Sequence, residues 1–487
     1  MRSHPQPHAP RAAAALTPFL EIARRGLAFT AHDGQAFLRL PVPASDGFTI
    51  FPVRSQAFRD WFFNASHAAL DRIPSPQSFA HILNFLEARA AADPDNQRLS
   101  VFRRIGARGQ SVFPTEILLD LANADAQFVA ISPTGWKVCA GDNALLQLSR
   151  ATRELAIPAD VDDPVAALEI LRSALNLPSR TDWLRCLVWL LTAFRPLIPY
   201  PILVLQGPSG CGKSFVARIL RMLIDPTATP LAPLPHNTGH LFSLARQHWV
   251  LAFDHVSKLS PQLTDAFCRL TTGAGSMIGE TSRQDFSREP LLQSFRRPLI
   301  FTVTPDFELP PAFAARAITV HLPQIPAARR RSEADLRGTI ADAYPQILGG
   351  LCAVVSTALS RIASIRPTQS PCLADTFAWA LAAAPAIGAS DSEIQDAFVQ
   401  PVDPVLAAIE ALLGPESSWS GTPSELLELL PPSPHFNTPW RLTFYLNHSL
   451  SLLAAGICIA ATKPGGKRRI RLFRPTQLQQ SKRRIAA

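Results

Sequence analysis

A glycine-rich turn between a strand pattern and a helix pattern constrains this chain more than any other feature. Residues 202–205 form a short apolar run, typical of a buried strand. The next residues, 207–214, read GPSGCGKS and fit the pattern G-x-x-x-x-G-K-[ST] at every fixed position. Apolar residues then recur with a helical period up to Leu223. A strand, a glycine turn and a helix in this order predict a phosphate-binding loop.

The residue types of this loop suit a nucleoside triphosphate and its Mg²⁺. Glycines let backbone N–H groups surround a phosphate at the N-terminus of a helix. Lys213 would reach the β- and γ-phosphates, and the Ser214 hydroxyl would ligate Mg²⁺. The alternative is a glycine turn that only leads into an ordinary helix. We expect ATP and Mg²⁺ as ligands of a loop made of Gly207, Pro208, Ser209, Gly210, Cys211, Gly212, Lys213 and Ser214.

A second apolar run, HWVLAFD at 248–254, predicts a buried strand that ends in Asp254. Its position, 41 residues after Lys213, suits the second Mg²⁺-binding element of P-loop enzymes, in which Asp254 would hold the metal through water. A lone acid at a strand end can also be a simple helix cap. Beside a complete phosphate loop, we favour the metal role, shared by Ser214 and Asp254.

Further apolar runs at 298–303 and 317–322 read as two more buried strands. Helical patterns lie at 164–194 and 261–272, and 272–275 reads as a flexible loop. Apolar strands separated by helices predict an α/β fold, a P-loop NTPase with a parallel sheet and helices on both faces. We assign this ATPase domain, with its helical lead-in, to residues 151–365.

The residues before it predict a small accessory α+β domain at 17–150, preceded by a disordered leader at 1–16. The leader is rich in His and Pro and lacks the apolar core of a signal peptide. Helices are expected at 55–70 and 75–92, the second capped by Ser75. Strands are expected at 27–30, 36–40, 48–53, 99–105, 127–131 and 136–139.

The residues after the ATPase domain predict a helical, winged-helix-like domain at 373–474, followed by a basic tail at 475–487. Strands at 457–461 and 469–473 flank the sequence KPGGK, which reads as a β-hairpin with a glycine tip. A winged helix could contact nucleic acid, whereas the alternative is a small helical cap with a solvated basic hairpin. Helices are expected at 376–384, 404–413, 423–430 and 440–455.

The charge of the chain is concentrated at this end. The net charge is +9, and residues 461–487 contain nine Lys or Arg and no Asp or Glu. The tail could contact the phosphate backbone of DNA, or it could serve only solubility. Seven cysteines without a C-x-x-C pair indicate neither a disulfide framework nor a zinc knuckle, which fits a reducing cytoplasm. We expect no membrane span, since the best candidate, 187–205, is interrupted by Arg195 and prolines.

These motifs together resemble a known family, the helicase-type ATPase half of phage- and plasmid-borne primase–helicases, which is related to superfamily 3 and AAA+ ATPases. The resemblance extends over most of the chain. In order, it is carried by FPVRSQAF, RPLIPYPILVLQGPSGCGKS, VLAFDHVSKLS, LTDAFCRLTTGAG, RRPLIFTVTP, AARAITVHLPQIP, YPQILGGL, WSGTPSELLELL and LLAAGICI.

The resemblance implies an ATP-hydrolysing homo-oligomeric ring that acts on DNA, with a primase supplied separately. It also implies catalytic roles for Asp254, His255, Thr302 and Arg316. Arg316 would reach the γ-phosphate held by a neighbouring subunit. His255 and Thr302 depart from the family's pattern, which has Asn at both positions.

We therefore expect a cytoplasmic P-loop ATPase, the helicase component of a mobile element's DNA replication system, that binds single-stranded or forked DNA. Two alternatives stay open. The chain could be a nucleotide-binding switch that acts on a partner without unwinding. It could also be a DNA-binding assembly factor that holds ATP as a structural ligand.

Overall fold

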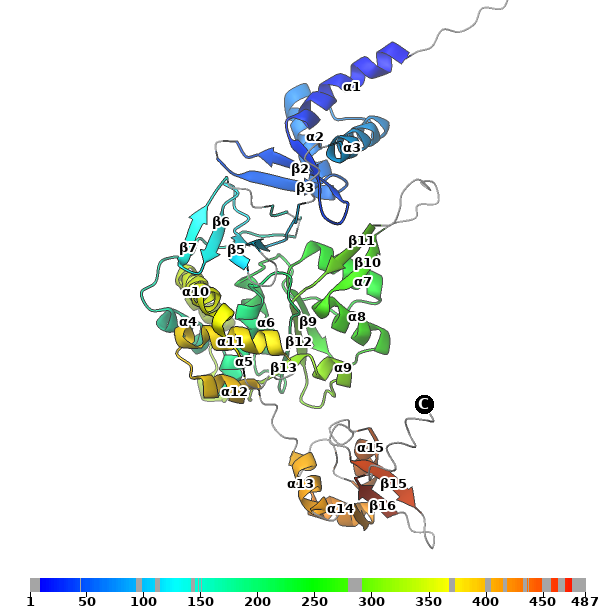
Figure 1. Cartoon of the computed structure of the whole chain (residues 1–487), viewed down its shortest axis with the longest axis vertical. Coiled ribbons are helices and arrows are strands. Elements are labelled where there is room, and N and C mark those ends of the chain that lie inside the picture. Colours follow the sequence, from blue (N-terminus) through cyan, green and yellow to red (C-terminus); the bar gives the residue numbers. More distant parts are fainter. Residues whose placement is uncertain are drawn as a thin grey trace, which may run out of the picture. The chain divides into compact units, whose positions relative to one another are not determined.

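The computed structural model describes residues 9–43, 45–92, 99–109, 114–141, 145–147, 149, 151–278, 291–367, 373–398, 404–414, 418–431, 436, 438–448, 457–462 and 469–474. The chain divides into two compact units (Figure 1). Unit 1 comprises Met1–Pro305 and Ala312–Phe398, and unit 2 comprises Asp306–Pro311 and Val399–Ala487.

A four-stranded parallel sheet lies at the centre of unit 1. Its strands are β8 (Ile202–Gln206), β9 (Leu251–Val256), β12 (Leu299–Val303) and β13 (Ala317–His321). Their order across the sheet is β13-β8-β12-β9, and every neighbouring pair is parallel. Strands covered on both faces need apolar side chains throughout, which is why these four read as continuous apolar runs. The predicted α/β fold with a parallel sheet is confirmed.

Helices cover both faces of this sheet. On one face, Phe253 and Phe301 contact Phe267 of α8 (Pro261–Thr272), and Phe301 also contacts Phe313 of α9 (Pro311–Ala314). The alternate side chains, such as Leu203 and Leu205, pack on the other face in one cluster with α5 (Arg180–Thr192) and α6 (Lys213–Met222). The helix α7 (Thr238–Gln247) packs beside α8.

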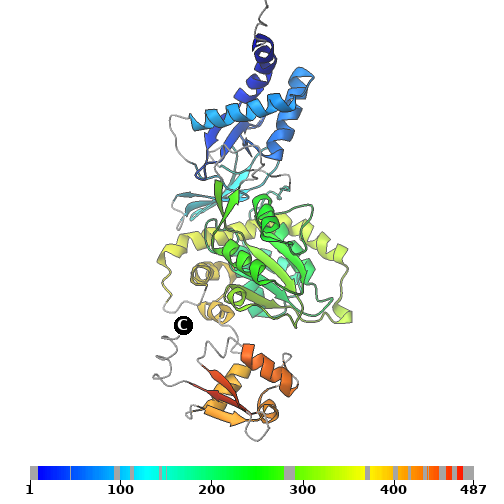
Figure 2. The same cartoon turned by 90° about the vertical axis from the view of Figure 1, so that its right-hand side faces the viewer.

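A long helix, α10 (Glu333–Arg361), extends the same core (Figure 2). It packs against α4 (Pro164–Ala174) and α11 (Ala374–Ala383), while α12 (Asp391–Phe398) packs on α5 and α11. The helical stretch 327–364 is long and apolar enough to span a membrane, but 67% of its apolar window is buried inside the protein. That burial is typical of a core helix.

The N-terminal part of unit 1 has a core of its own. The helix α1 (Ala9–Arg24) precedes the antiparallel strands β1 (Leu27–Thr30), β2 (Ala36–Pro41) and β3 (Phe48–Pro52). The helices α2 (Gln56–Leu70) and α3 (Pro76–Ala91) begin at the predicted caps, where the side chains of Ser55 and Ser75 accept backbone N–H bonds. Residues 9–16 belong to α1, so the expected leader at 1–16 is wrong there; residues 1–8 lie outside the described residues.

The rest of the expected accessory domain shares the core that surrounds the parallel sheet. An antiparallel sheet is formed by β4 (Ile105–Gly109), β5 (Pro114–Asp120), β6 (Phe128–Ser132) and β7 (Gly135–Cys139). Its apolar side chains join the same cluster as α4 and α10. The strand expected at 99–105 is wrong: Arg104 has φ 58°, a left-handed conformation that ends an extended run just before β4. Residues 17–150 therefore do not form the single accessory domain that the sequence predicted, because β4 to β7 pack into the core around the parallel sheet.

Two further expectations differ from the structure. The loop expected at 272–275 contains the start of β10 (Ala274–Ile278), which pairs antiparallel with β11 (Leu291–Phe295). Residues 373–398, assigned to the last domain, belong to unit 1, because α11 and α12 bury their apolar faces on α5 and α10. The strand β10 is specified by pairing with the next strand, whereas α11 and α12 are placed by helices far away in the sequence.

Unit 2 combines three helices with a three-stranded antiparallel sheet. The helices are α13 (Pro404–Leu413), α14 (Pro423–Leu429) and α15 (Pro439–His448). The strands β14 (Ser418–Gly421), β15 (Cys458–Thr462) and β16 (Arg469–Phe473) lie in the order β14-β16-β15. This arrangement has the helices and hairpin expected of a winged-helix-like module. The hairpin tip at 463–468, the end of the expected helix 440–455 and the basic tail 475–487 lie outside the described residues.

Candidate nucleotide-binding site

The phosphate loop joins the carboxyl end of β8 to the first residue of α6. A side chain at Gly207 would meet the carbonyl oxygen of Leu322 at 2.4 Å, so only glycine fits there. Gly210 and Gly212 have φ +75° and +91°, conformations that disfavour other residues. No side chain caps the N-terminus of α6, so its first N–H groups are free to meet an anion. The backbone thus has the shape that phosphate binding requires.

Lys213 folds back over this loop. Its Nζ donates hydrogen bonds of 2.7 Å to the carbonyl oxygens of both Gly207 and Pro208. The residue is only 9% exposed. The ammonium group is therefore held against the loop, where it adds a full positive charge to the partial charge of the helix end.

Ser214, Asp254 and Thr302 form one hydrogen-bonded cluster beside Lys213. The Ser214 hydroxyl donates to Asp254 Oδ1 at 2.8 Å, and the Thr302 hydroxyl donates to the same oxygen. The three side chains come from α6, β9 and β12, so the parallel order of the strands brings them to one edge of the sheet. The sequence predicted that Asp254 ends its strand, whereas the structure places it inside β9.

His255 contributes its backbone to this cluster more than its side chain. Its N–H donates to Thr302 Oγ1 at 2.9 Å. The imidazole is 84% exposed, with Nε2 3.6 Å from Asp254 Oδ2. Its φ of 54° is left-handed, a region in which Asn, Asp and His are the favoured residues other than glycine. The left-handed backbone therefore accommodates His255 at the position where the family that the sequence resembles has Asn.

Arg316 lies apart from these residues. It immediately precedes β13, and Ala317 pairs in register with Ile202 at the start of β8, so Arg316 lies at the amino edge of the sheet. The phosphate loop leaves the carboxyl edge. The Arg316 guanidinium donates to the carbonyl oxygen of Ala312 at 2.8 Å. Its expected role on a neighbouring subunit's nucleotide stays a prediction.

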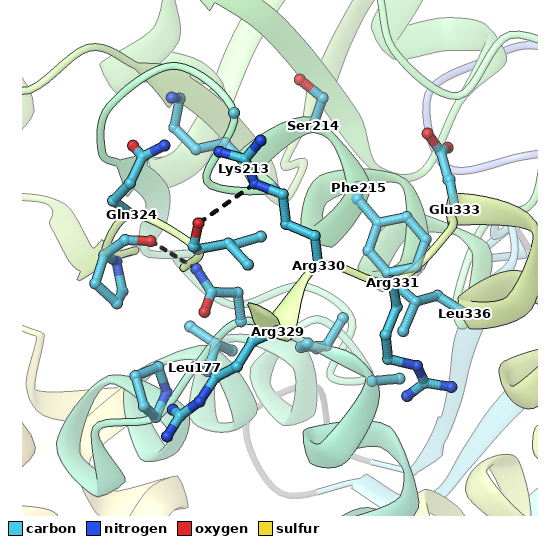
Figure 3. A pocket seen from close by; sticks show the side chains of 18 of the residues that line it. Leu177, Lys213, Ser214, Phe215, Gln324, Arg329, Arg330, Arg331, Glu333 and Leu336 are labelled. Atoms are coloured by element: carbon cyan, nitrogen blue, oxygen red, sulfur yellow. Dashed lines mark hydrogen bonds between the residues drawn. The ribbon is translucent and has the colours of Figure 1, made fainter. Parts of the chain in front are cut away.

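A pocket of about 1140 Å³ opens over the loop. Figure 3 shows Lys213 and Ser214 along one side, with the apolar side chains of Leu177 and Leu336 on other walls. Arg330 crosses the pocket toward Lys213, while Arg329 and Arg331 point away from it. The Arg330 Nε donates to the carbonyl oxygen of Ile325 at 3.4 Å, which fixes the direction of its side chain.

Sequence reasoning missed several of these lining residues. The run of arginines at 329–331 matches no motif, although its position just after β13 places it near the carboxyl edge of the sheet. Asn176 gave no signal, yet its Nδ2 donates to the carbonyl oxygens of Cys211 and Pro323 at 3.0 and 2.7 Å. It thereby ties the phosphate loop to the segment after β13. Glu333 forms an ion pair with Arg218 at 3.1 Å on the rim.

The site's composition fits a Mg-nucleotide rather than a metal bound by protein alone. Hydroxyl and carboxylate oxygens, as in Ser214 and Asp254, are the ligands that Mg²⁺ prefers, usually together with water and phosphate. Among the described residues, no group of three or more His, Cys, Asp or Glu could hold a metal ion. A metal here would therefore need further ligands from a bound phosphate.

Comparison with known proteins gives one family match. Residues 169–391, slightly less than half of the chain, match a family described as "Actinomycete integrative conjugative element replication protein" (AICE_RepA). The matched range includes the phosphate loop, β9, β12 and α10. No curated protein matches the chain.

Several solved structures are distantly similar. The A-form apo structure of the NrS-1 C-terminal region is 9% identical, with a TM-score of 0.37, and the match covers 93% of this chain and 97% of that one. A second apo structure of the same region (305–718) is 7% identical, with a TM-score of 0.37 and coverages of 94% and 98%. JCV Helicase with a bound acetamide compound is 12% identical, with a TM-score of 0.24 and coverages of 42% and 63%. TM-scores this low do not establish a shared fold.

Proposed function

We propose that this protein is an ATP-binding P-loop ATPase that serves as the helicase component of a phage- or plasmid-type DNA replication system. It would bind Mg-ATP over the phosphate loop and act in the cytoplasm as a homo-oligomeric ring on single-stranded or forked DNA. A separate primase would supply the primers.

The cluster of Ser214, Asp254 and Thr302 beside Lys213 is the observation that carries this proposal. A glycine turn alone could hold any anion, but this cluster adds metal-ligating oxygens at the same edge of the sheet. A bound Mg²⁺ would neutralise charge on the phosphates. Lys213 would hold the β- and γ-phosphates, Ser214 and Asp254 would orient the metal, and Thr302 would keep the Asp254 carboxylate in place. The apolar walls near Leu177 and Leu336 suit a base.

The family match supports the replication role. Its description names a replication protein of a mobile element, and its range covers the whole phosphate-binding apparatus. The DNA partner, the ring and the helicase reaction are part of the proposal and follow from the resemblance of the motifs.

A second candidate is a nucleotide-dependent switch that turns over slowly or not at all. This candidate is favoured by the ion pairs that the acidic residues lining the pocket already form. Of its described acidic lining residues, Glu169 pairs with Arg172 at 3.4 Å and Glu333 pairs with Arg218 at 3.1 Å. Both are therefore engaged, and neither can readily act as a general base for a water molecule. This candidate predicts tight ATP binding without DNA-stimulated hydrolysis, whether the chain acts on a partner or in an assembly.

One series of measurements separates these functions. Calorimetry should show Mg-ATP binding to the full chain and its loss in Lys213→Ala, because that change removes the charge that meets the phosphates. Lys258→Ala removes an equal charge from an exposed position outside the pocket and should bind like the wild type. If Lys213→Ala binds ATP at wild-type affinity, the proposed site is wrong. If Lys213→Ala loses ATP binding as expected, hydrolysis assays of the wild type separate the two functions. DNA-stimulated hydrolysis would favour the helicase, and ATP binding without turnover would favour the switch.

A further inference from the structure

A second basic cavity lies in unit 1, away from the phosphate loop. It has a volume of about 990 Å³ and lies where residues 31–57 and 99–103 meet the segments 246–249 and 295–297. Its described lining residues include one acid, Asp33, and five arginines: Arg54, Arg103, Arg246, Arg296 and Arg297. We call it the arginine cavity.

Arg103 is the residue that makes this cavity unusual. Its Nε and Nη1 atoms are shielded from solvent and have no hydrogen-bond partner in the described part of the chain. The adjacent Arg104 shows what a fully used buried arginine looks like. Its guanidinium donates to the carbonyl oxygens of Asp120 and Arg153 at 2.7 Å each, and lies 3.4 Å from Asp225 Oδ1. Among the described residues, the Arg104 guanidinium therefore has hydrogen-bond partners, whereas Nε and Nη1 of Arg103 have none.

The nearby acids are already engaged elsewhere. Besides facing Arg104, Asp225 accepts the backbone N–H groups of Trp249 and Val250 at 2.7 and 3.1 Å through Oδ2. Asp120 accepts the backbone N–H of Ala122 at 2.8 Å. Among the described residues, neither carboxylate hydrogen-bonds to Arg103, so both attract its charge only from a distance.

The other arginines add to this positive charge. Arg297 uses its Nε on the carbonyl oxygens of Ala245 and His248, at 2.9 and 3.0 Å, and lies over the ring of Trp249. Arg296 donates to the carbonyl oxygen of Leu197. These partners are neutral, so they fix the side chains without cancelling their charge. Arg54 differs, because Glu87 pairs with it at 2.5 Å.

Burial makes the position of Arg103 unfavourable for a charged group. Burial, and next the charge of Arg297, lower the pKa of Arg103 to about 9, so it still carries its charge at neutral pH. A buried cation whose donors lack partners is costly to the folded state. An anionic ligand that accepts from these donors would remove that cost.

We propose that the arginine cavity is a second phosphate-binding site, for phosphate groups carried either by a free nucleotide or by the backbone of a nucleic acid. A guanidinium presents a planar fork of N–H donors that matches phosphate oxygens. The free donors of Arg103 supply this fork, and Arg296 and Arg297 are held in place beside it. The buried rings of Trp249 and Phe295 form part of the wall, and the Arg297 guanidinium lies over both of them. The site does not rest on the function proposed for the phosphate loop.

The test uses the full chain with Lys213→Ala as background, so that the phosphate loop does not contribute. The probes are tripolyphosphate, ATP and a single-stranded oligothymidylate, measured by calorimetry and thermal unfolding. Arg103→Met in this background should lower the affinity for the bound probe by tenfold or more, which corresponds to the loss of about one charge-assisted contact. Without any probe the same change should raise the melting temperature, because it removes the uncompensated cation. A purely structural arginine would show the opposite sign.

Matched variants keep the test decisive. Arg269→Gln removes the same charge from an ion-paired, exposed position on α8 and should change neither quantity. Arg103→Lys retains charge but loses the fork, so it should bind with intermediate affinity even if Arg103→Met fails to fold. Binding of tripolyphosphate alone identifies a free phosphate as the source, and binding of oligothymidylate at equal or higher affinity identifies a nucleic-acid backbone. If the Lys213→Ala protein binds no probe, or binds it independently of Arg103, the proposal is wrong.

Discussion

The hydroxyl of Ser214 donates a 2.8 Å hydrogen bond to Asp254 Oδ1, which joins the first turn of α6 to β9 across 40 residues of sequence. A helix residue and a strand residue are thereby fixed side by side at the carboxyl edge of the sheet. Ser214 and Asp254 would hold a bound Mg²⁺ there, with Asp254 acting through water, and no change in the backbone would be needed.

Asp254→Asn should abolish metal-dependent turnover while preserving the fold. The amide keeps the shape and can still accept the bonds from Ser214 and Thr302, but it lacks the negative charge that holds a cation. We expect turnover to fall by about a hundredfold or more, since a catalytic metal supplies several kcal/mol of transition-state stabilisation. Titration of Mg²⁺ in an ATPase assay measures it. An unchanged Mg²⁺ dependence would exclude Asp254 as a metal-binding residue.

Thr302→Val should act on stability as well as on the site. Thr302 is 1% exposed, and its hydroxyl serves both Asp254 and the N–H of His255. An isosteric valine leaves that N–H without its acceptor, which costs about 1–3 kcal/mol of unfolding free energy. Urea unfolding measures this loss. Thr302→Ser keeps the hydroxyl and should recover most of it; equal losses in both variants would show that packing, not hydrogen bonding, is responsible.

Arg316→Ala should suppress turnover far more than ATP binding. Arg316 and the phosphate loop lie at opposite edges of the sheet, so a catalytic role for this arginine requires a nucleotide on another subunit. An arginine supplied in this way contributes on the order of 10³-fold or more to phosphoryl transfer. Mixing Arg316→Ala with Lys213→Ala chains should restore part of the activity, since some interfaces then combine one intact loop with one intact arginine. No recovery in mixtures that do assemble would contradict the role in trans.

Stability should depend on pH through His248. Burial, and next the charge of Arg221, lower its pKa from 6.5 to about 4 in the folded chain. Between these values the unfolded chain binds more protons, so the free energy of unfolding decreases as the pH falls from 6.5 toward 4. The loss is on the order of 1–3 kcal/mol. Urea midpoints against pH should show a shallower decrease in His248→Gln, whereas the exposed His67→Gln should leave the decrease unchanged.

Basic residues between β15 and β16 in the sequence should determine the salt dependence of DNA binding. Lys463, Lys467 and Arg468 can be changed together to Gln without touching β16, whose Ile470 and Leu472 are buried in the core of unit 2. Each lost phosphate contact should flatten the log–log salt slope by about 0.7–0.9. Fluorescence anisotropy at several salt concentrations measures the slope. The same three-charge change at Lys258, Arg269 and Arg337 is the control, and equal effects of both sets would mean that only overall charge matters.

The sequence predicted elements whose determinants are local. The helix α8 has the predicted bounds, because Ser260 caps it, Pro261 starts it and Gly273 ends it. The four apolar strands were equally clear, since burial on both faces leaves little choice of residue. The roles of the phosphate loop and of Asp254 stay predictions, and the sequence pointed to them for a related reason: the chemistry expected of them fixes both residue type and spacing.

Features that depend on pairing or packing with another element were missed. The strand β5 contains Pro114 and Glu116 and is specified by pairing with its neighbours β4 and β6. The strand β10 has a loop-like sequence, with two glycines within four residues, and pairs with the next strand, β11. The helices α11 and α12 belong to unit 1 through contacts with the distant helices α5 and α10. Asn176 reaches the site from a segment whose position no local pattern reveals.

The strand order of unit 2 also constrains when this unit can form. Its central strand, β16, is the last described element of the chain, and both β14 and β15 pair only with it. During synthesis, α13, β14 and α14 are therefore made long before the strand that completes their sheet. Until residue 473 has left the ribosome, two strand edges and an apolar cluster stay without their partner, a condition in which nascent chains depend on chaperones. Unit 1, which is complete by residue 398, can fold while unit 2 is still being made.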